Sequence, residues 1–173
     1  MSKKIWNEGM TLIELAVVVC IIGIVAAIAA PSVIGFMPRL KLSSQVSAIQ
    51  NDIQRARIKS ISLNTIYRIR FFLYSYPKTD GYRGYYYDAT KKTWISDVEM
   101  LDENDDLFLK KINKSVDLAY IGSSGYSSGI YSMYFLSDGT CIARDIFFKN
   151  TVDQKKKIEI QENTGFMKIH DNW

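Results

Sequence analysis

The stretch that decides the architecture is Gly9-Met10-Thr11-Leu12-Ile13-Glu14-Leu15, near the start of a chain of 173 residues. It opens a long apolar run, because Glu14 is the only charged residue from Met10 to Met37. At about 1.5 Å per residue, a helix over residues 10–37 would reach roughly 42 Å, more than the roughly 30 Å of a bilayer's hydrocarbon core. The composition therefore predicts a membrane-spanning helix with a carboxylate just inside it.

Three interpretations of this run differ in what they make of Glu14. An ordinary single-pass anchor would let the carboxylate reach back to the membrane interface. A secretory signal peptide would use Lys3-Lys4 as its basic region and Ala27-Ile28-Ala29 as its cleavage signal. In the third interpretation residues 1–9 are removed as a short basic leader. The new amine at Met10 would then be a cation in apolar surroundings, which a nearby carboxylate could neutralise. We favour the third interpretation because it explains the acid.

The same residues carry a family resemblance. Gly9 followed by Met10-Thr11-Leu12-Ile13-Glu14-Leu15 and a Val/Ile/Ala run resembles the class III signal of type IV pilins and type II secretion pseudopilins. The resemblance implies that a prepilin peptidase cuts after Gly9 and methylates the amine of Met10. It implies that Glu14 pairs with the N-terminal amine of an adjacent subunit, and that Pro31 is the helix-kinking proline. The usual first mature residue is phenylalanine, so Met10 is a departure.

Beyond the apolar run the helical period continues and then changes. Apolar residues recur at spacings of three and four and predict an amphipathic helix over residues 38–62: Leu42, Val46, Ile49, Ile53 and Ala56. After Asn64 the period becomes two, which is typical of strands. Residues 65–74 should place Tyr67, Ile69, Phe71 and Leu73 on one face and Arg68 and Arg70 on the other. Further strands are predicted near 84–87, 93–95, 115–121, 130–136, 140–148, 157–160 and 166–170.

Two turns join these strands as antiparallel hairpins. Asp138-Gly139 connects the strands at 130–136 and 140–148, and Asn163-Thr164-Gly165 connects the last two. The first hairpin contains Phe135, Asp138, Gly139 and Thr140, and resembles the Phe-x-x-Asp-Gly-Thr hairpin of minor pseudopilins of the GspH/FimT group. The second resembles that group's final hairpin, with Gly165 in the turn. Many members carry arginine directly after that glycine, whereas this chain has Phe166.

Candidate chemistry in the β-rich part is sparse. The sole histidine, His170, has no evident catalytic partners, so no enzyme activity and no cofactor are expected. Asp102 and Asp106 stand in a run that begins like a calcium loop, but Leu107 and Asn113 replace its required glycine and glutamate. They are weak metal candidates, and a solvated acidic loop is favoured. The net charge of +4 is far from that of a dedicated nucleic-acid binder.

Two local clusters of residues could still contact nucleic acid. Three lysines at 155–157, and four tyrosines around Arg83, could contact a polyanion or stack on single-stranded bases. We favour strand residues with one solvated edge for the tyrosines and a solvated turn for the lysines. Nucleic acid is therefore an unfavoured partner.

The expected fold class is α+β, with a long N-terminal helix, transmembrane in one half and amphipathic in the other, packed on a mostly antiparallel head as in the pilin fold. The expected organisation is leader 1–9, filament-core helix 10–37, helix extension 38–62 and head 63–173. The resemblance implies a structural subunit of a type II secretion pseudopilus or type IV pilus, near the filament tip. Its partners would be other subunits, the prepilin peptidase, the assembly platform, inner-membrane lipid and secreted cargo, with the head in the periplasm. The alternatives are a DNA-uptake pilin and an unprocessed single-pass membrane protein.

Overall fold

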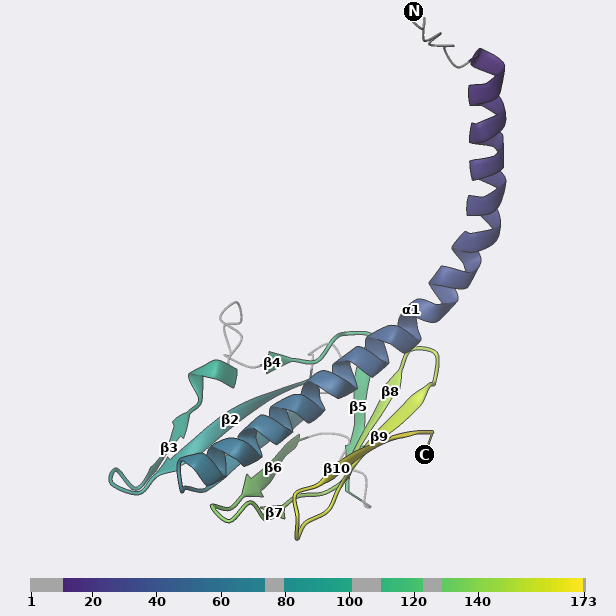
Figure 1. Cartoon of the computed structure of the whole chain (residues 1–173). Helices are drawn as coiled ribbons and strands as arrows, with labels where there is room; N and C mark the ends of the chain where they lie inside the picture. Colours follow the sequence, from purple (N-terminus) through teal and green to yellow (C-terminus); the bar gives the residue numbers. More distant parts are fainter. Residues whose placement is uncertain (1–10, 74–79, 101–109, 123–128, 173) are drawn as a thin grey trace, which may run out of the picture. The chain divides into compact units, whose positions relative to one another are not determined.

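The computed structural model describes residues 11–73, 80–100, 110–122 and 129–172, without the side chains of residues 29–34, 100 and 120 (Figure 1). Helix α1 is followed by strands β1 to β3, a 3-10 turn η1 and strands β4 to β10. The chain divides into two compact units, residues 1–37 and 38–173. Each unit is described by itself.

The predicted fold class is wrong in its helical part. We expected one long N-terminal helix, transmembrane over residues 10–37, on a pilin head. α1 is bounded by Leu12 and Ser62, but it is described in two stretches, residues 12–28 and 35–62, and it crosses the boundary between the two units. In the described part of the chain, no helix is long and apolar enough to cross a membrane. The first stretch reaches only about 26 Å, and the second soon carries Arg39 and Lys41.

In the second unit, the amphipathic pattern of the helix is confirmed. Leu42, Val46, Ile49, Ile53 and Ala56 are each at most 1% exposed, because they form one stripe that packs on the strands. The polar residues of an amphipathic helix normally lie off its buried stripe. Asp52 and Ser60 are exceptions, with 3% and 0% of their surfaces exposed. Burial of a carboxylate requires partners, which are described below.

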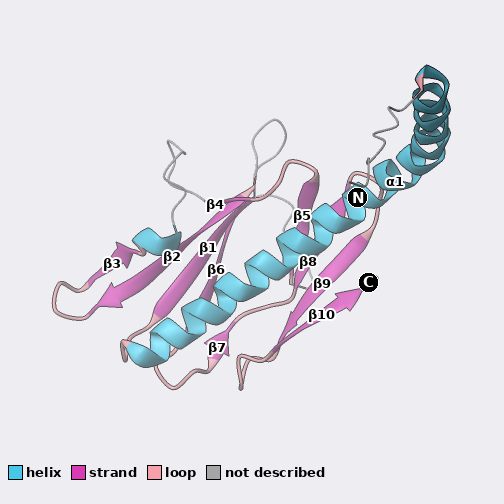
Figure 2. Ribbon diagram, turned by 45° about the horizontal axis from the view of Figure 1, so that its top comes forward, coloured by secondary structure: helices cyan, strands magenta, loops and turns pink. Residues whose placement is uncertain are grey.

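The six-stranded sheet has the order β3-β2-β1-β6-β7, with β4 paired to β2 (Figure 2). Its strands are β1 (Tyr67–Leu73), β2 (Gly81–Asp88), β3 (Thr93–Ser96), β4 (Lys110–Lys111), β6 (Gly129–Phe135) and β7 (Cys141–Ile142); η1 is Val98–Met100. β1 follows the predicted alternation, since Tyr67, Ile69, Phe71 and Leu73 are buried in the core that α1 shares. The opposite face of the sheet carries Arg68 and Arg70.

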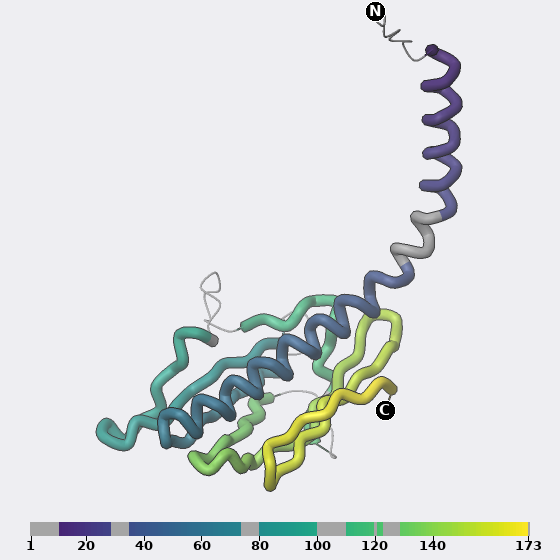
Figure 3. Tube along the Cα trace, in the orientation of Figure 1, coloured from purple at the N-terminus to yellow at the C-terminus, as the bar shows by residue number. Residues whose placement is uncertain are grey.

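The four-stranded sheet has the order β10-β9-β8-β5. Its strands are β5 (Val116–Ile121), β8 (Ile146–Asn150), β9 (Lys155–Ile160) and β10 (Met167–Asp171). Every strand pairing that the described residues make is antiparallel, as predicted. The predicted strand over 140–148 is wrong. It is two strands, because the chain leaves one sheet after Ile142 and joins the other at Ile146, a course that Figure 3 follows.

Candidate functional site

The start of α1 is fixed by a capping box. The Thr11 hydroxyl accepts a hydrogen bond from the backbone N–H of Glu14 at 3.3 Å. The Glu14 carboxylate accepts hydrogen bonds from the Thr11 backbone N–H and hydroxyl at 2.8 and 2.9 Å. This T-x-x-E pattern satisfies two backbone donors that the first turn of a helix otherwise leaves unpaired. Glu14 therefore has a local role in this chain besides any role between subunits.

Three of the predicted site residues at this end of the chain cannot be placed. Gly9 and Met10, the predicted cleavage site, lie outside the described residues. Pro31, the predicted kink, falls in residues 29–34, whose side chains lie outside the described ones. Cleavage, N-methylation and the kink thus stay predictions from the sequence.

Residues 12–28 present an uncovered apolar surface on every side of the helix. Its large side chains are between 45% and 87% exposed, with Leu12 the most exposed. We name the following set the apolar helix surface: Leu12, Ile13, Leu15, Val17, Val18, Val19, Ile21, Ile22, Ile24, Val25 and Ile28. A helix that is apolar all round is normally buried in protein or lipid. This surface therefore calls for a cover outside the described residues of the chain.

In the second unit, α1 meets both predicted hairpin turns at one arginine. The Arg57 Nε donates a hydrogen bond to the Gly139 carbonyl oxygen at 2.9 Å. A Cβ placed on Gly165 would lie 2.7 Å from both Cδ and Nε of Arg57. Gly139 and Gly165 have φ values of 86° and 62°, in the left-handed region that favours glycine. We name these three residues the arginine junction. The sequence singled out the two glycines but not Arg57.

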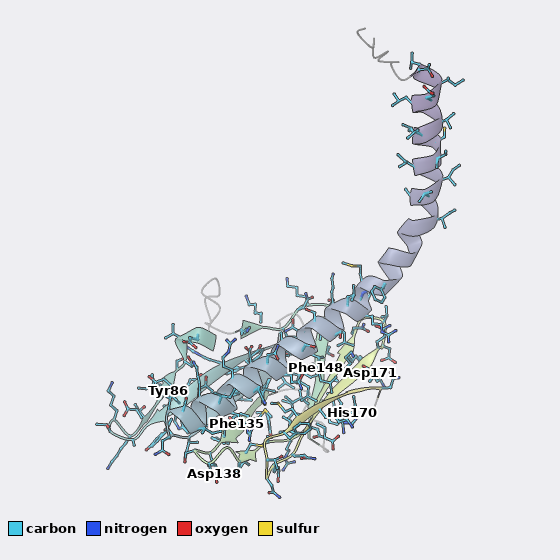
Figure 4. All side chains as sticks on the ribbon, viewed as in Figure 1. Tyr86, Phe135, Asp138, Phe148, His170 and Asp171 are labelled. Atoms are coloured by element: carbon cyan, nitrogen blue, oxygen red, sulfur yellow. The ribbon has the colours of Figure 1, made fainter. Side chains whose placement is uncertain are left out.

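The remaining hairpin residues shape the turn that enters this junction. Phe135 is fully buried at the end of β6, while Asp138 lies on the exposed turn (Figure 4). The Asp138 carboxylate accepts hydrogen bonds from the Thr140 hydroxyl and backbone N–H at 2.7 and 2.9 Å. These bonds lower the pKa of Asp138 below its usual value. Hydrogen bonds between Asp138 and Thr140 thus close the turn of the Phe-x-x-Asp-Gly-Thr pattern, and Arg57 of the helix binds the carbonyl oxygen of its glycine.

Phe166, where the pseudopilin group that the hairpin resembles often carries arginine, places an apolar ring on the surface. Phe166 is 58% exposed, directly after Gly165. The arginine that contacts Gly165 comes instead from the helix, through Arg57. The final hairpin therefore has an arginine beside its glycine, supplied by a different element of the fold.

Two clusters of tyrosine, aspartate and lysine fasten the helix to its surroundings, and the sequence pattern did not reveal either of them. In the first, Asp97 accepts hydrogen bonds from Tyr67 at 2.5 Å and Lys59 at 2.6 Å. Burial acts to raise the pKa of Asp97, but the bonds from Lys59 and Tyr67 hold it below its usual value. Lys59 also contacts Glu99 at 2.7 Å. The cluster ties the last turns of α1 to η1.

The second cluster surrounds the buried Asp52. Its Oδ2 accepts hydrogen bonds from Tyr82 on β2 and Lys110 on β4, each at 2.6 Å. Arg55 lies 4.0 Å away on the next turn of the helix. Burial, with the hydrogen bond to Asp52, raises the pKa of Tyr82, so the phenol stays neutral and donates. The hydrogen bonds from Tyr82 and Lys110 explain why the Asp52 carboxylate is tolerated on the face of α1 that packs on the core.

The remaining candidates are His170 and the two acidic residues of the predicted loop, Asp102 and Asp106. His170 lies near the C-terminal end of β10, with its Nε2 2.6 Å from the Glu159 carboxylate on β9 (Figure 4). Asp102 and Asp106, the weak metal candidates, lie outside the described residues. Among the residues that the structure describes, no group of three or more His, Cys, Asp or Glu side chains could hold a metal ion.

Most of the described candidates lie at the start of α1 or at the arginine junction, where their contacts cap the helix or join it to the two hairpin turns. Comparison of the chain with protein-family models, with curated proteins and with solved structures finds no match.

Proposed function

We propose that this chain is the precursor of a minor pilin or pseudopilin, a structural subunit that a prepilin peptidase processes and that assembles through its N-terminal helix. The observation that carries the proposal is the apolar helix surface, which begins two residues after Met10 and has no cover in the described part of the chain. The Gly9-Met10 pair directly before it fits a peptidase site. A leader that ends there would leave the helix intact.

The apolar helix surface supplies the driving force for assembly. Burying one large aliphatic side chain contributes about 1.5–3 kcal/mol, so four of them contribute on the order of 6–12 kcal/mol. Copies of the same helix, packed side by side in a filament, would cover each other in this way. Before assembly, inner-membrane lipid would cover the same side chains. The membrane and its assembly platform, the prepilin peptidase and the other subunits are thus the proposed partners.

Glu14 supplies the register of assembly in this proposal. Apolar helices slide past one another at little cost, whereas a buried carboxylate must meet a cation. The amine at Met10 of a neighbouring processed subunit would be that cation. The capping box already holds the Glu14 carboxylate at the start of the helix, through Thr11. A newly made N-terminus therefore has a defined carboxylate to meet.

The proposal is tested by separating the charge of Glu14 from its capping role. Glu14→Gln keeps a capping-box residue but removes the charge, while Thr11→Val keeps the charge but removes the capping hydroxyl. Each full-length variant is expressed in cells with a complete assembly system, and its amount in sheared filaments is compared with its amount in membranes. We expect Glu14→Gln to be stable but at least tenfold depleted from filaments, and Thr11→Val to be incorporated within about threefold of the wild-type chain. Wild-type incorporation of Glu14→Gln would refute the role of the charge, and absence of the unmodified chain from filaments would refute the proposed function.

A further inference from the structure

One face of the six-stranded sheet collects arginine and aromatic side chains from four strands. This is the face opposite α1, which covers the other side (Figure 2). Strand register places Arg68 beside Tyr85 and Tyr134, and Arg70 beside Arg83, on this face. Tyr87 pairs with Trp94 at its edge. We name the set Arg68, Arg70, Arg83, Tyr85, Tyr87, Trp94 and Tyr134 the cationic aromatic face.

The guanidinium groups on this face lie over aromatic rings. The Arg68 Cζ is 4.1 Å from the centroid of Trp94 and 4.8 Å from that of Tyr85. Arg70 and Arg83 lie 5.9 and 5.5 Å from the Tyr85 centroid. The Trp94 ring is in turn 5.4 Å from Tyr87 and 6.1 Å from Tyr134. Stacking of this kind orients planar guanidinium groups in fixed positions.

Arg68 and Arg70 carry positive charge that no described carboxylate on this face balances. The described residues of β1, β2, β3 and β6 that point to this side include no aspartate or glutamate. Neither Arg68 nor Arg70 forms an ion pair with a described residue, and the Nε of each is buried without a hydrogen-bond partner in that part of the chain. Aromatic rings lie against these guanidinium groups and offset part of the cost of the two covered Nε donors, while both side chains remain partly exposed and carry charge that an anion could meet. The electrostatics therefore suit an anionic partner.

We propose that the cationic aromatic face binds single-stranded nucleic acid. The phosphates would meet the guanidinium groups of Arg68 and Arg70, which suit bidentate contact with phosphate oxygens. The unpaired bases would stack on the aromatic rings and on the guanidinium planes, as bases do on an open sheet face that presents aromatic side chains. An acidic peptide would satisfy the charge but would leave the aromatic rings without planar partners. This proposal is independent of processing and of filament assembly.

The sequence suggested base stacking by the tyrosines around Arg83, but it did not show that residues of β1, β3 and β6 join them on one face. Its arginines and tyrosines are spread over residues 68–134, and only antiparallel pairing of β1 with β2 and β6 brings them together. The lysines at 155–157, which the sequence suggested as the alternative contact, lie on the other sheet. The two basic regions can thus be tested separately.

The test uses the full-length chain in a mild non-ionic detergent and a fluorescein-labelled oligothymidylate of about 20 nucleotides. Anisotropy titrations between about 50 and 200 mM salt give the affinity and its salt dependence. The test variant is Arg68→Gln/Arg70→Gln. The matched control is Lys149→Gln/Lys168→Gln, which removes the same charge from exposed positions on β8 and β10.

We expect the test variant to bind at least tenfold more weakly, with a salt slope smaller by about 1.4, because about 0.7 is lost for each phosphate contact on a single strand. The control should stay within about twofold of the wild-type chain. Absence of salt-dependent binding by the wild-type chain, an unchanged affinity of the test variant, or equal loss in the control would each overturn the proposal. So would competition by polyaspartate as strong as that by unlabelled oligothymidylate, which would identify an acidic polypeptide instead.

A measurement on the unmodified chain covers the case in which the test variant fails to fold. Ultraviolet crosslinking of the oligothymidylate, followed by peptide mass mapping, reports which strands touch the bases. We expect crosslinks in residues 81–88 and 93–96, which hold Tyr85, Tyr87 and Trp94. Crosslinks confined to residues 149–171 would overturn the proposal.

Discussion

Replacing Gly165 with alanine tests how the last hairpin is joined to the helix. Gly165 has a φ of 62°, and an added Cβ would lie 2.7 Å from Cδ and Nε of Arg57 and 3.0 Å from the Gly139 carbonyl oxygen. The Arg57 side chain would have to move. Its hydrogen bond to the Gly139 carbonyl oxygen, 2.9 Å long, would then be strained or broken.

The expected cost can be divided between backbone and side chain. Holding alanine in the left-handed region costs about 1 kcal/mol, and losing a hydrogen bond from a charged donor costs about 1.5–3 kcal/mol. Gly165→Ala should therefore lower the free energy of unfolding by about 3 kcal/mol. For a unit of this size, that corresponds to a fall in Tm of roughly 10 °C.

The assay is thermal unfolding followed by near-ultraviolet circular dichroism, whose signal comes chiefly from the aromatic side chains of the second unit. An Arg57→Ala background is the control for backbone strain, because it keeps Gly165 at a φ of 62° but removes the side chain that an added Cβ would meet. In an Arg57→Ala background the cost of Gly165→Ala should fall to about 1 kcal/mol, since the clash is gone. If Gly165→Ala lowered the free energy of unfolding equally with and without Arg57, the proposed packing of Arg57 against Gly165 would be refuted.

Three further outcomes follow from the same contacts. Asp52→Ala should destabilise the fold by about 1–3 kcal/mol in urea unfolding, because the buried hydroxyl of Tyr82 loses its acceptor, whereas Lys110, 39% exposed, can turn to solvent; a cost below about 0.5 kcal/mol would contradict this. The pKa of Asp97 is lower in the folded state, so its contribution to stability is fully present above the ordinary value of about 3.9 and is lost as pH falls through the native value. Asp97→Asn should thus show a shallower loss of stability between about pH 5 and 2, and an unchanged acid profile would count against the cluster. Thr11→Val should weaken the start of α1 by about 1 kcal/mol, seen as faster amide exchange at residues 12–15 with exchange at residues 42–56 unchanged.

The spacing of apolar residues and the position of glycine predicted the buried face of the helix, the buried face of β1 and one hairpin turn. The three-four spacing of Leu42 to Ala56 identified the buried stripe because a helix repeats every 3.6 residues. The alternation in β1 identified its buried face because strand side chains alternate. The Asp138-Gly139 turn was predicted because glycine tolerates a positive φ.

Features that depend on contacts between distant residues could not be predicted in this way. Arg57 is an ordinary polar position of an amphipathic helix until Gly139 and Gly165 are placed beside it, 82 residues away in the case of its hydrogen bond. Aspartate on an amphipathic helix is normally solvated, and the burial of Asp52 depends on Tyr82 and Lys110. The split of the predicted strand at 140–148 reflects a change of sheet, which local alternation does not encode. The membrane-spanning prediction failed because it counted all of residues 10–37 as one apolar helix. The described apolar stretch, residues 12–28, reaches only about 26 Å, less than the hydrocarbon core of a bilayer.

Processing after Gly9, which would release an assembling helix, is the step on which the proposed function depends. Its most direct test is the intact mass of the chain recovered from cells that contain a prepilin peptidase. We expect a chain that begins at Met10 and carries one added methyl group, and we expect Gly9→Val to keep residues 1–9. An unmodified chain that keeps Lys3 and Lys4 beside the active peptidase would contradict this expectation.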